Sequence, residues 1–179
     1  MNYPIYRTHP HTEPAVTCVI PYKEGEVFNP VHVCENDEVI VVTGGETIGH
    51  ARIAGAKAAS NEWIVQMDAD AVYPKDYILK VKKCIREATY PVLAARRIGG
   101  FGDLIFNVHE HGLIVRRDVF LERCADYPEG VRQAGNRTDV ADLFRDAIKI
   151  DAEYYHGFTK GERSAVVLGT AATMWLLSK

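Results

Sequence analysis

The sequence predicts an α/β domain with a mostly parallel central sheet flanked by helices. Short apolar runs rich in β-branched residues alternate with segments of helical period, which is the pattern of parallel strands joined by right-handed crossovers. Polar or glycine-containing loops follow several of these runs directly, as they do at the ligand-binding edge of open α/β sheets. The chain has 179 residues, of which 47% are hydrophobic, enough for one domain with a real core.

Charge and targeting signals narrow the class of protein. The net charge of -3 gives no basic excess, so we do not expect nucleic acid as a partner. Residues 1–14 contain several prolines and read as an irregular N-terminal arm without a signal-peptide core, in which His9 and His11 fit a solvated surface better than a metal site. The absence of targeting signals favours a cytoplasmic location. The cysteines are scattered without metal-finger or redox spacing and fit reduced thiols: Cys18, Cys34, Cys84 and Cys124.

The first predicted strand covers residues 15–20 and is stopped by Pro21. Tyr22 and Glu24 follow it directly, at the position where open α/β sheets bind ligands. Tyr22 can stack on a base, and Glu24 can accept a hydrogen bond from a base or a ribose. A plain turn with a solvated glutamate is the alternative.

A second strand is predicted over residues 38–43, followed by a Gly44-Gly45 turn and an alanine-rich helix over residues 47–60. The small residues of this helix favour close packing on a sheet. Arg52, in its first turns, can reach a diphosphate or hold a carboxylate, or it can lie on the surface. The glycines do not form the Gly-x-Gly-x-x-Gly pattern of dinucleotide sites, so we do not expect NAD.

The third strand organises the predicted site. Residues 63–70 form a short apolar run that ends in Asp68 and Asp70, which share one face of an extended backbone. Two neighbouring carboxylates repel each other unless a cation lies between them, and oxygen ligands favour Mg²⁺ or Mn²⁺ shared with a diphosphate. Alternatively, the two aspartates cap the turn and helix that follow.

A helix over residues 75–88 and a strand over residues 91–95 continue the alternation, which then changes. His109 and His111 flank a glutamate in a segment expected to be extended. Without an obvious third ligand nearby, they favour a polar substrate surface over a structural metal site. The sequence next predicts a short strand at residues 113–115 and a short helix at residues 117–124.

The last third of the chain offers further polar candidates. A helix over residues 138–149 would place Asp139 and Asp142 on one face, where one can act as a general base or both can serve as capping and surface residues. His156 follows a late strand and can complete a metal site or contact phosphate. Residues 165–177 form an apolar helix candidate too short to span a bilayer, which suits a core, a subunit interface or, as the minor alternative, a peripheral membrane contact.

Together these segments resemble the family 2 glycosyltransferases, whose GT-A fold is a single-domain, Rossmann-like fold, over residues 15–155. The resemblance implies a hexosyltransferase-like enzyme that moves a sugar from a UDP- or GDP-linked donor to a hydroxyl of an acceptor glycan, lipid or protein, with Mn²⁺ or Mg²⁺ and inversion. Residues 15–97 would form the nucleotide-binding half, and residues 98–179 the acceptor-binding half. The matching blocks are Ile20-Pro21-Tyr22-Lys23-Glu24, Val39 to Thr43, Gly49-His50-Ala51-Arg52-Ile53-Ala54-Gly55 and Met67-Asp68-Ala69-Asp70.

The resemblance also implies roles for single residues. Asp70 looks like the metal ligand, supported by Asp68 and a late histidine, His156. Asp139 is the favoured base and Asp142 the second choice, although aligning the family's Asp-Leu puts Val140 where the base is expected. The nucleotide-binding residues would be Pro21, Tyr22, Glu24, Thr43, Arg52, Asp68 and Ala69.

One departure from the family's pattern, the stereochemistry and two alternative functions stay open. Family members often carry two aspartates where this chain has Thr43-Gly44-Gly45, which leaves the nucleotide base undetermined. Retention stays possible because inversion depends on the base. A phosphohydrolase of the haloacid dehalogenase type would use Asp68 as nucleophile and Asp70 as acid/base, although its motif normally lies on the first strand. The other alternative is a module that binds nucleotide sugars without turnover.

Overall fold

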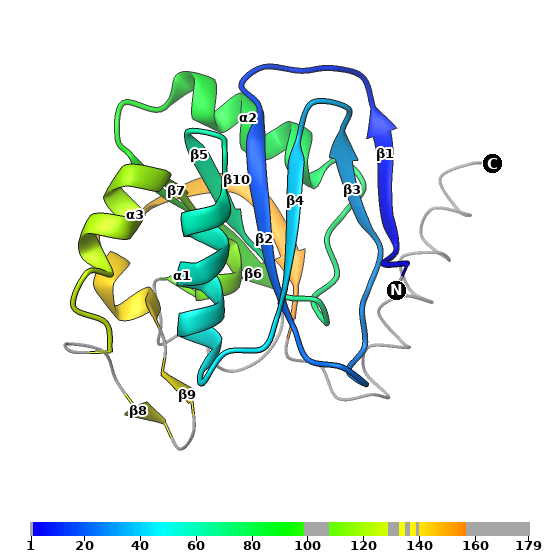
Figure 1. Cartoon of the computed structure of the whole chain (residues 1–179). Helices are drawn as coiled ribbons and strands as arrows, with labels where there is room; N and C mark the ends of the chain where they lie inside the picture. Colours follow the sequence, from blue (N-terminus) through cyan, green and yellow to red (C-terminus); the bar gives the residue numbers. More distant parts are fainter. Residues whose placement is uncertain (1, 99–107, 129–132, 135–136, 139, 157–179) are drawn as a thin grey trace.

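The computed structural model describes residues 2–98, 108–128, 133–134, 137–138 and 140–156, and its centre is a six-stranded sheet. The strand order is β10-β6-β7-β5-β2-β4 (Figure 1). The pairs β2–β4, β2–β5 and β6–β10 are parallel, whereas β7 is antiparallel to both of its neighbours. The predicted mostly parallel α/β sheet is therefore confirmed. The strands are β2 (Val16–Tyr22), β4 (Glu38–Thr43), β5 (Trp63–Gln66), β6 (Val92–Ile98), β7 (Leu113–Arg116) and β10 (Ile148–Tyr155).

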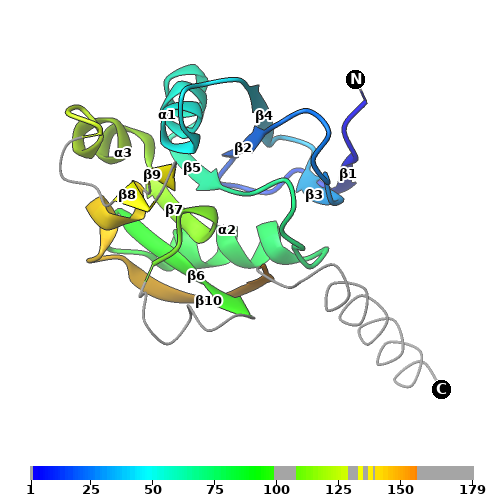
Figure 2. The ribbon, with the colours of Figure 1, turned by 90° about the horizontal axis from the view of Figure 1, so that it is seen from below.

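Helices cover both faces of this sheet, as Figure 2 shows. The helices α1 (Ile48–Ala58) and α3 (Arg117–Arg123) lie on one face, and α2 (Tyr77–Glu87) lies on the other. Successive side chains of β2 point to opposite faces of the sheet. Cys18 therefore packs in the core beneath α2, and Val19 packs in the core beneath α1. At Gly55 of α1, a Cβ would lie 2.3 Å from a Val19 methyl, so this helix packs as closely as its small residues predict.

The N-terminal arm is more regular than expected. Strand β1 (Ile5–His9) pairs in parallel with β3 (Val31–Cys34), which the sequence analysis did not predict. The prediction of an irregular lead-in was wrong because Pro4 and Pro10 flank β1 instead of interrupting it.

A buried ion pair ties this small sheet to α2. Lys82 Nζ lies 2.6 Å from Asp37 Oδ1, and both side chains are fully buried. The Asp37 carboxylate also accepts hydrogen bonds from the backbone N–H groups of Val16 (3.1 Å) and Cys34 (2.8 Å). Lys82 Nζ donates to the Thr12 carbonyl at 2.5 Å. One lysine on an otherwise apolar helix face therefore joins α2, both sheets and the N-terminal arm.

The chain after β7 differs most from expectation. The helix predicted over residues 138–149 is a 3₁₀ turn, η3 (Val140–Phe144), and Ile148 already pairs with Leu93 of β6. A longer helix would remove the start of β10 from the sheet. Asp139 and residues 165–177 lie outside the described residues, and no helix in the described part is long and apolar enough to cross a membrane. The remaining elements are η2 (Glu110–Gly112), β8 (Gln133–Ala134) and β9 (Arg137–Thr138).

Candidate active site at the carboxyl ends of the strands

The predicted polar residues gather where β2, β4 and β5 end. These strands are parallel neighbours, so their carboxyl ends meet at one edge of the sheet, and Tyr22 lies opposite Thr43 in register. Strand β5 ends at Gln66, which places Asp68 and Asp70 in a turn instead of on an extended backbone. The expectation of a shared strand face was therefore wrong in its local geometry, although both carboxylates do approach the same histidine.

Arg52 holds the first of the two aspartates. It is fully buried in α1, and its Nη2 forms an ion pair with Asp68 Oδ1. Its Nη1 donates to the Met67 carbonyl at 3.1 Å and to Gln66 Oε1 at 3.3 Å. Of the three possibilities for Arg52, the structure excludes a surface position. The buried guanidinium instead holds the Asp68 carboxylate in place. The start of α1 is fixed by its N-cap residue Thr47, whose hydroxyl accepts a hydrogen bond from the backbone N–H of His50.

The second oxygen of Asp68 faces two imidazoles. Asp68 Oδ2 lies 3.2 Å from His111 Nδ1 and 3.5 Å from His156 Nε2, and His156 Nε2 lies 3.1 Å from Asp70 Oδ1. The ligand atoms of Asp68, His111 and His156 all lie within 4.8 Å of one another. We call Asp68, Asp70, His111 and His156 the acid–imidazole cluster. It brings together the predicted metal residues and adds His111, which the sequence analysis assigned to a polar substrate surface in preference to a metal site.

Two imidazoles of this region, those of His109 and His111, have lowered pKa values. Burial lowers the pKa of His111 well below its ordinary value, and the nearby charges of His156 and Arg52 lower it further. Burial, with Arg97 next, lowers the pKa of His109 to about 4. Within the described residues, His111 Nε2 and His156 Nδ1 are buried and have no hydrogen-bond partner. Imidazole nitrogens next to two carboxylates are a donor set that suits a divalent cation.

Tyr73 fixes the two sides of the cluster against each other. Its hydroxyl accepts the backbone N–H of Asp68 and donates to the backbone carbonyl of His111, both at 2.9 Å. Its ring stacks on Tyr154, with centroids 5.5 Å apart. A Cβ at Gly112 would lie 2.5 Å from the same Tyr154 ring, so the absence of a side chain at Gly112 lets the His111 segment approach.

Asn29 holds the turn that carries Asp70. Its backbone N–H donates to the Ala69 carbonyl at 2.7 Å, and its Nδ2 donates to the Asp70 carbonyl at 2.8 Å. Asn29 thereby joins the loop after β2 to the turn after β5. Ala69 itself is buried in this turn.

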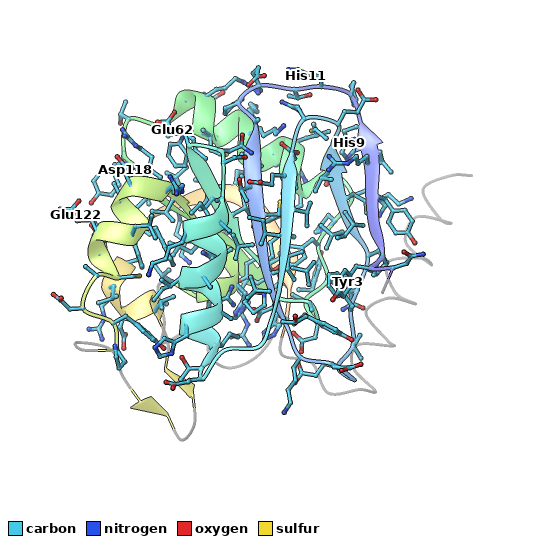
Figure 3. The ribbon with its side chains drawn as sticks, in the orientation of Figure 1. Tyr3, His9, His11, Glu62, Asp118 and Glu122 are labelled. Carbon is cyan, nitrogen blue, oxygen red and sulfur yellow. The ribbon has the colours of Figure 1, made fainter. Side chains whose placement is uncertain are left out.

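The predicted nucleoside pocket lies at the same edge. Tyr22 is half-buried and contacts Tyr3 and Phe28, with ring centroids 5.5 and 5.4 Å apart. Pro21 is also half-buried, whereas Glu24 and Thr43 are exposed. Figure 3 shows Tyr3 at this end of the molecule.

His9 and His11 lie at the opposite end (Figure 3). His9 Nε2 lies 2.7 Å from the Lys75 carbonyl, and His11 Nε2 lies 2.7 Å from Glu13 Oε1. These two histidines are therefore separate from the acid–imidazole cluster.

Of the two candidate bases, only Asp142 lies among the described residues. Asp142 lies in η3, where its Oδ1 accepts a hydrogen bond from Arg145 Nη2 at 2.8 Å. Asp139 lies outside the described residues. The choice between them stays a prediction.

An Asp-x-Asp turn with an imidazole beside it, at the carboxyl edge of a mostly parallel sheet, defines an α/β protein with a ligand site at its strand ends. The sequence profile of Glycosyl transferase family 2 matches residues 29–148, so the chain belongs to that family. This membership argues against the phosphohydrolase alternative. Comparison with curated protein sequences found no match.

Solved structures show the same fold. The structure of S. aureus TarS 1–349 in complex with UDP-GlcNAc is similar, with a TM-score of 0.55 and 14% identity over 82% of this chain. Glucosyl-3-phosphoglycerate synthase from Mycobacterium tuberculosis, in complex with Mn²⁺, UDP and glucosyl-3-phosphoglycerate, gives a TM-score of 0.57 and 12% identity over 86% of this chain. The match spans 59% of the TarS chain and 75% of the synthase chain. At these identities the likeness concerns the fold alone.

Proposed function

We propose that this protein transfers a sugar from a nucleotide diphosphate sugar to an acceptor hydroxyl of a glycan, lipid or protein. The observation that carries the proposal is the approach of Asp68, Asp70 and His156 to one another at the carboxyl edge of a family 2 domain. The ligands of the two similar structures, UDP-GlcNAc in one and Mn²⁺ with UDP in the other, support the same chemistry here.

The nucleotide would bind across the ends of β2, β4 and β5. Tyr22 offers a ring for the base, and Pro21, Glu24 and Thr43 surround the place where the base and ribose would lie. Because Thr43 has no carboxylate, we keep both UDP- and GDP-linked donors. Arg52, Asp68 and Ala69 would form the floor of this site. In this proposal residues 15–97 bind the nucleotide and residues 98–179 bind the acceptor.

The cluster fits a divalent cation, Mn²⁺ or Mg²⁺. Asp70 would hold it together with Asp68 and His156, and the fit is supported by the His156 imidazole, whose Nε2 lies within 3.5 Å of a carboxylate oxygen from each aspartate. Such a cation supplies charge neutralisation to the leaving diphosphate. Arg52, through Asp68, keeps the carboxylates in position for that ligand.

A general base completes the proposed reaction. Asp139 would take the proton from the acceptor hydroxyl as its oxygen attacks the anomeric carbon, and one displacement inverts that carbon. Because Asp142 already accepts a hydrogen bond from Arg145, we favour Asp139 as the base. A positioned general base accounts for a factor of about 10²–10⁴ in rate, so Asp139→Asn should lose activity by that factor while nucleotide binding persists.

The test is isothermal titration with UDP and GDP, with and without Mn²⁺, followed by a thermal-shift screen of nucleotide sugars. Asp70→Ala should abolish the metal-dependent part of nucleotide binding. Asp118→Ala, which removes an exposed aspartate from α3, is the matched control and should bind like the parent protein. Nucleotide binding that ignores both the metal and Asp70→Ala would contradict the proposal. If the protein binds nucleotide sugars but transfers no sugar to any acceptor, it is instead a non-catalytic binding module.

A further inference from the structure

His111 lies in the cluster at distances typical of ligands of one cation. Its Nδ1 is 3.2 Å from Asp68 Oδ2, and His156 Nε2 is 3.5 Å from the same oxygen. Two ligand atoms about 2.1 Å from one metal, at octahedral to tetrahedral angles, lie about 3.0–3.4 Å apart. The two measured distances are close to this spacing, so each imidazole can share a cation with Asp68 Oδ2.

Burial sets His111 apart from an ordinary polar residue. The residue is 7% exposed, and within the described part of the chain its Nε2 has no hydrogen-bond partner. The other ring nitrogen, Nδ1, faces Asp68 Oδ2, and a cation bound there would leave the ring proton on Nε2. Arg52 contacts Asp68 Oδ1 and leaves Oδ2 facing the imidazoles, so the arginine does not compete for that oxygen.

We propose that His111 is a further ligand of the cation that Asp70, Asp68 and His156 would hold, and that this second imidazole makes the site favour transition metals such as Co²⁺ and Zn²⁺ over Mg²⁺. Mg²⁺ prefers oxygen ligands and gives up its waters reluctantly, whereas imidazole nitrogen favours the later transition metals. His111 thus decides which metal serves the site. The proposal deepens the transferase function and rests on it for the role of the cation in catalysis.

Tyr73 acts as a positioning residue for this site. Its hydroxyl joins the backbone of Asp68 to that of His111, so its loss should let the carboxylate and the imidazole separate without removing either ligand. Tyr77 is a matched control, because it is equally buried, its ring lies 4.9 Å from that of Tyr73, and its hydroxyl has no partner among the described residues.

The experiment is titration of Mg²⁺, Mn²⁺, Co²⁺ and Zn²⁺ into the whole chain, without nucleotide and with UDP. The visible spectrum of bound Co²⁺ serves as a second readout. Affinity should increase in the order Mg²⁺, Mn²⁺, Co²⁺, Zn²⁺. His111→Ala should weaken Co²⁺ and Zn²⁺ binding by about tenfold or more and alter the Co²⁺ spectrum, while Mg²⁺ binding changes little. His111→Gln keeps a buried polar side chain and guards against a variant that does not fold.

Two controls separate ligation from packing. His109→Asn removes a neighbouring buried imidazole that stacks on His111, and it should keep the parent metal order. Tyr73→Phe should lower Co²⁺ affinity, whereas Tyr77→Phe should not. If folded His111→Ala and His111→Gln both bind Co²⁺ and Zn²⁺ as the parent does, the inference fails while metal-dependent UDP binding through Asp70 can still hold. If UDP binding ignores every metal, the transferase proposal fails instead.

Discussion

Two buried ion pairs in this protein serve different purposes. In the pair of Lys82 and Asp37, both side chains are fully buried, and the Asp37 oxygens also accept two backbone N–H groups. In the pair of Arg52 and Asp68, the arginine is fully buried but the Asp68 side chain is 13% exposed, and its second oxygen faces the imidazoles of His111 and His156. Both oxygens of Asp37 have partners, whereas the second oxygen of Asp68 can still bind a cation. This difference distinguishes a structural ion pair from a ligand site.

The largest expected effect is on stability, at the saturated pair. Lys82→Met leaves the Asp37 carboxylate buried without its cation, which should lower the free energy of unfolding by about 3–5 kcal/mol. Urea unfolding followed by circular dichroism measures it. Nucleotide affinity of the folded protein should stay unchanged. A loss below about 1 kcal/mol would remove the contrast between the two pairs.

At the open pair, Arg52→Met should destabilise less and affect binding more. Asp68 keeps two imidazole neighbours and some access to water, so we expect a loss of about 1–3 kcal/mol. Metal and nucleotide binding should weaken by about tenfold, because the carboxylate loses its orientation. Calorimetric titration alongside Lys82→Met checks both halves of this prediction. Unchanged ligand binding in a folded Arg52→Met protein would make this pair structural as well.

Acid should weaken the region of the cluster first. The pKa of His111 is lowered in the folded protein, so the unfolded chain takes up a proton at higher pH, and stability is full above about pH 6.5 and falls as the pH decreases below it. The slope approaches ~1.4 kcal/mol per pH unit for each such histidine. Urea unfolding at pH 7, 6 and 5 should show this slope, which His111→Gln should reduce. His11→Gln, on the exposed arm, is the control, and an equal slope in both variants would contradict the assignment.

The smallest expected effect compares two asparagines. Asn29 Nδ2 donates to the Asp70 carbonyl at the cluster, and Asn36 Nδ2 donates to the Thr12 carbonyl beside Lys82. Each change to alanine should cost about 1 kcal/mol of unfolding free energy. Only Asn29→Ala should also weaken metal-dependent nucleotide binding. If Asn36→Ala weakened it equally, the two regions would be coupled and could not be assigned separate roles.

The sequence predicted the elements whose patterns are local. The strands at β2, β4, β5 and β6 and the helices α1 and α2 each combine an apolar period with a clear stop, and the structure confirms them within a few residues. Strands β1 and β3 were missed because they are short and lie among prolines and histidines, and their stability depends on pairing with each other and on the distant Lys82. The residues of η3 have a helical pattern, but the pairing of β10 with β6 prevails over it.

The site was predictable as far as its residues lie in motifs. Asp68, Asp70 and Arg52 belong to recognisable blocks, and His156 follows a predicted strand. His111 was set aside because no third ligand is near it in the sequence, and its neighbours Asp68 and His156 meet it only through β5 and β10. Tyr73 and Asn29 act through backbone groups, which leave no signature in a pattern of side-chain types.

The contact between Gly112 and Tyr154 has an evolutionary consequence. Any larger residue at position 112 would collide with that aromatic ring and push the neighbouring imidazole outward. Related proteins that have histidine at position 111 should therefore also have glycine at position 112 and an aromatic residue at position 154. Related proteins without that histidine do not need either residue.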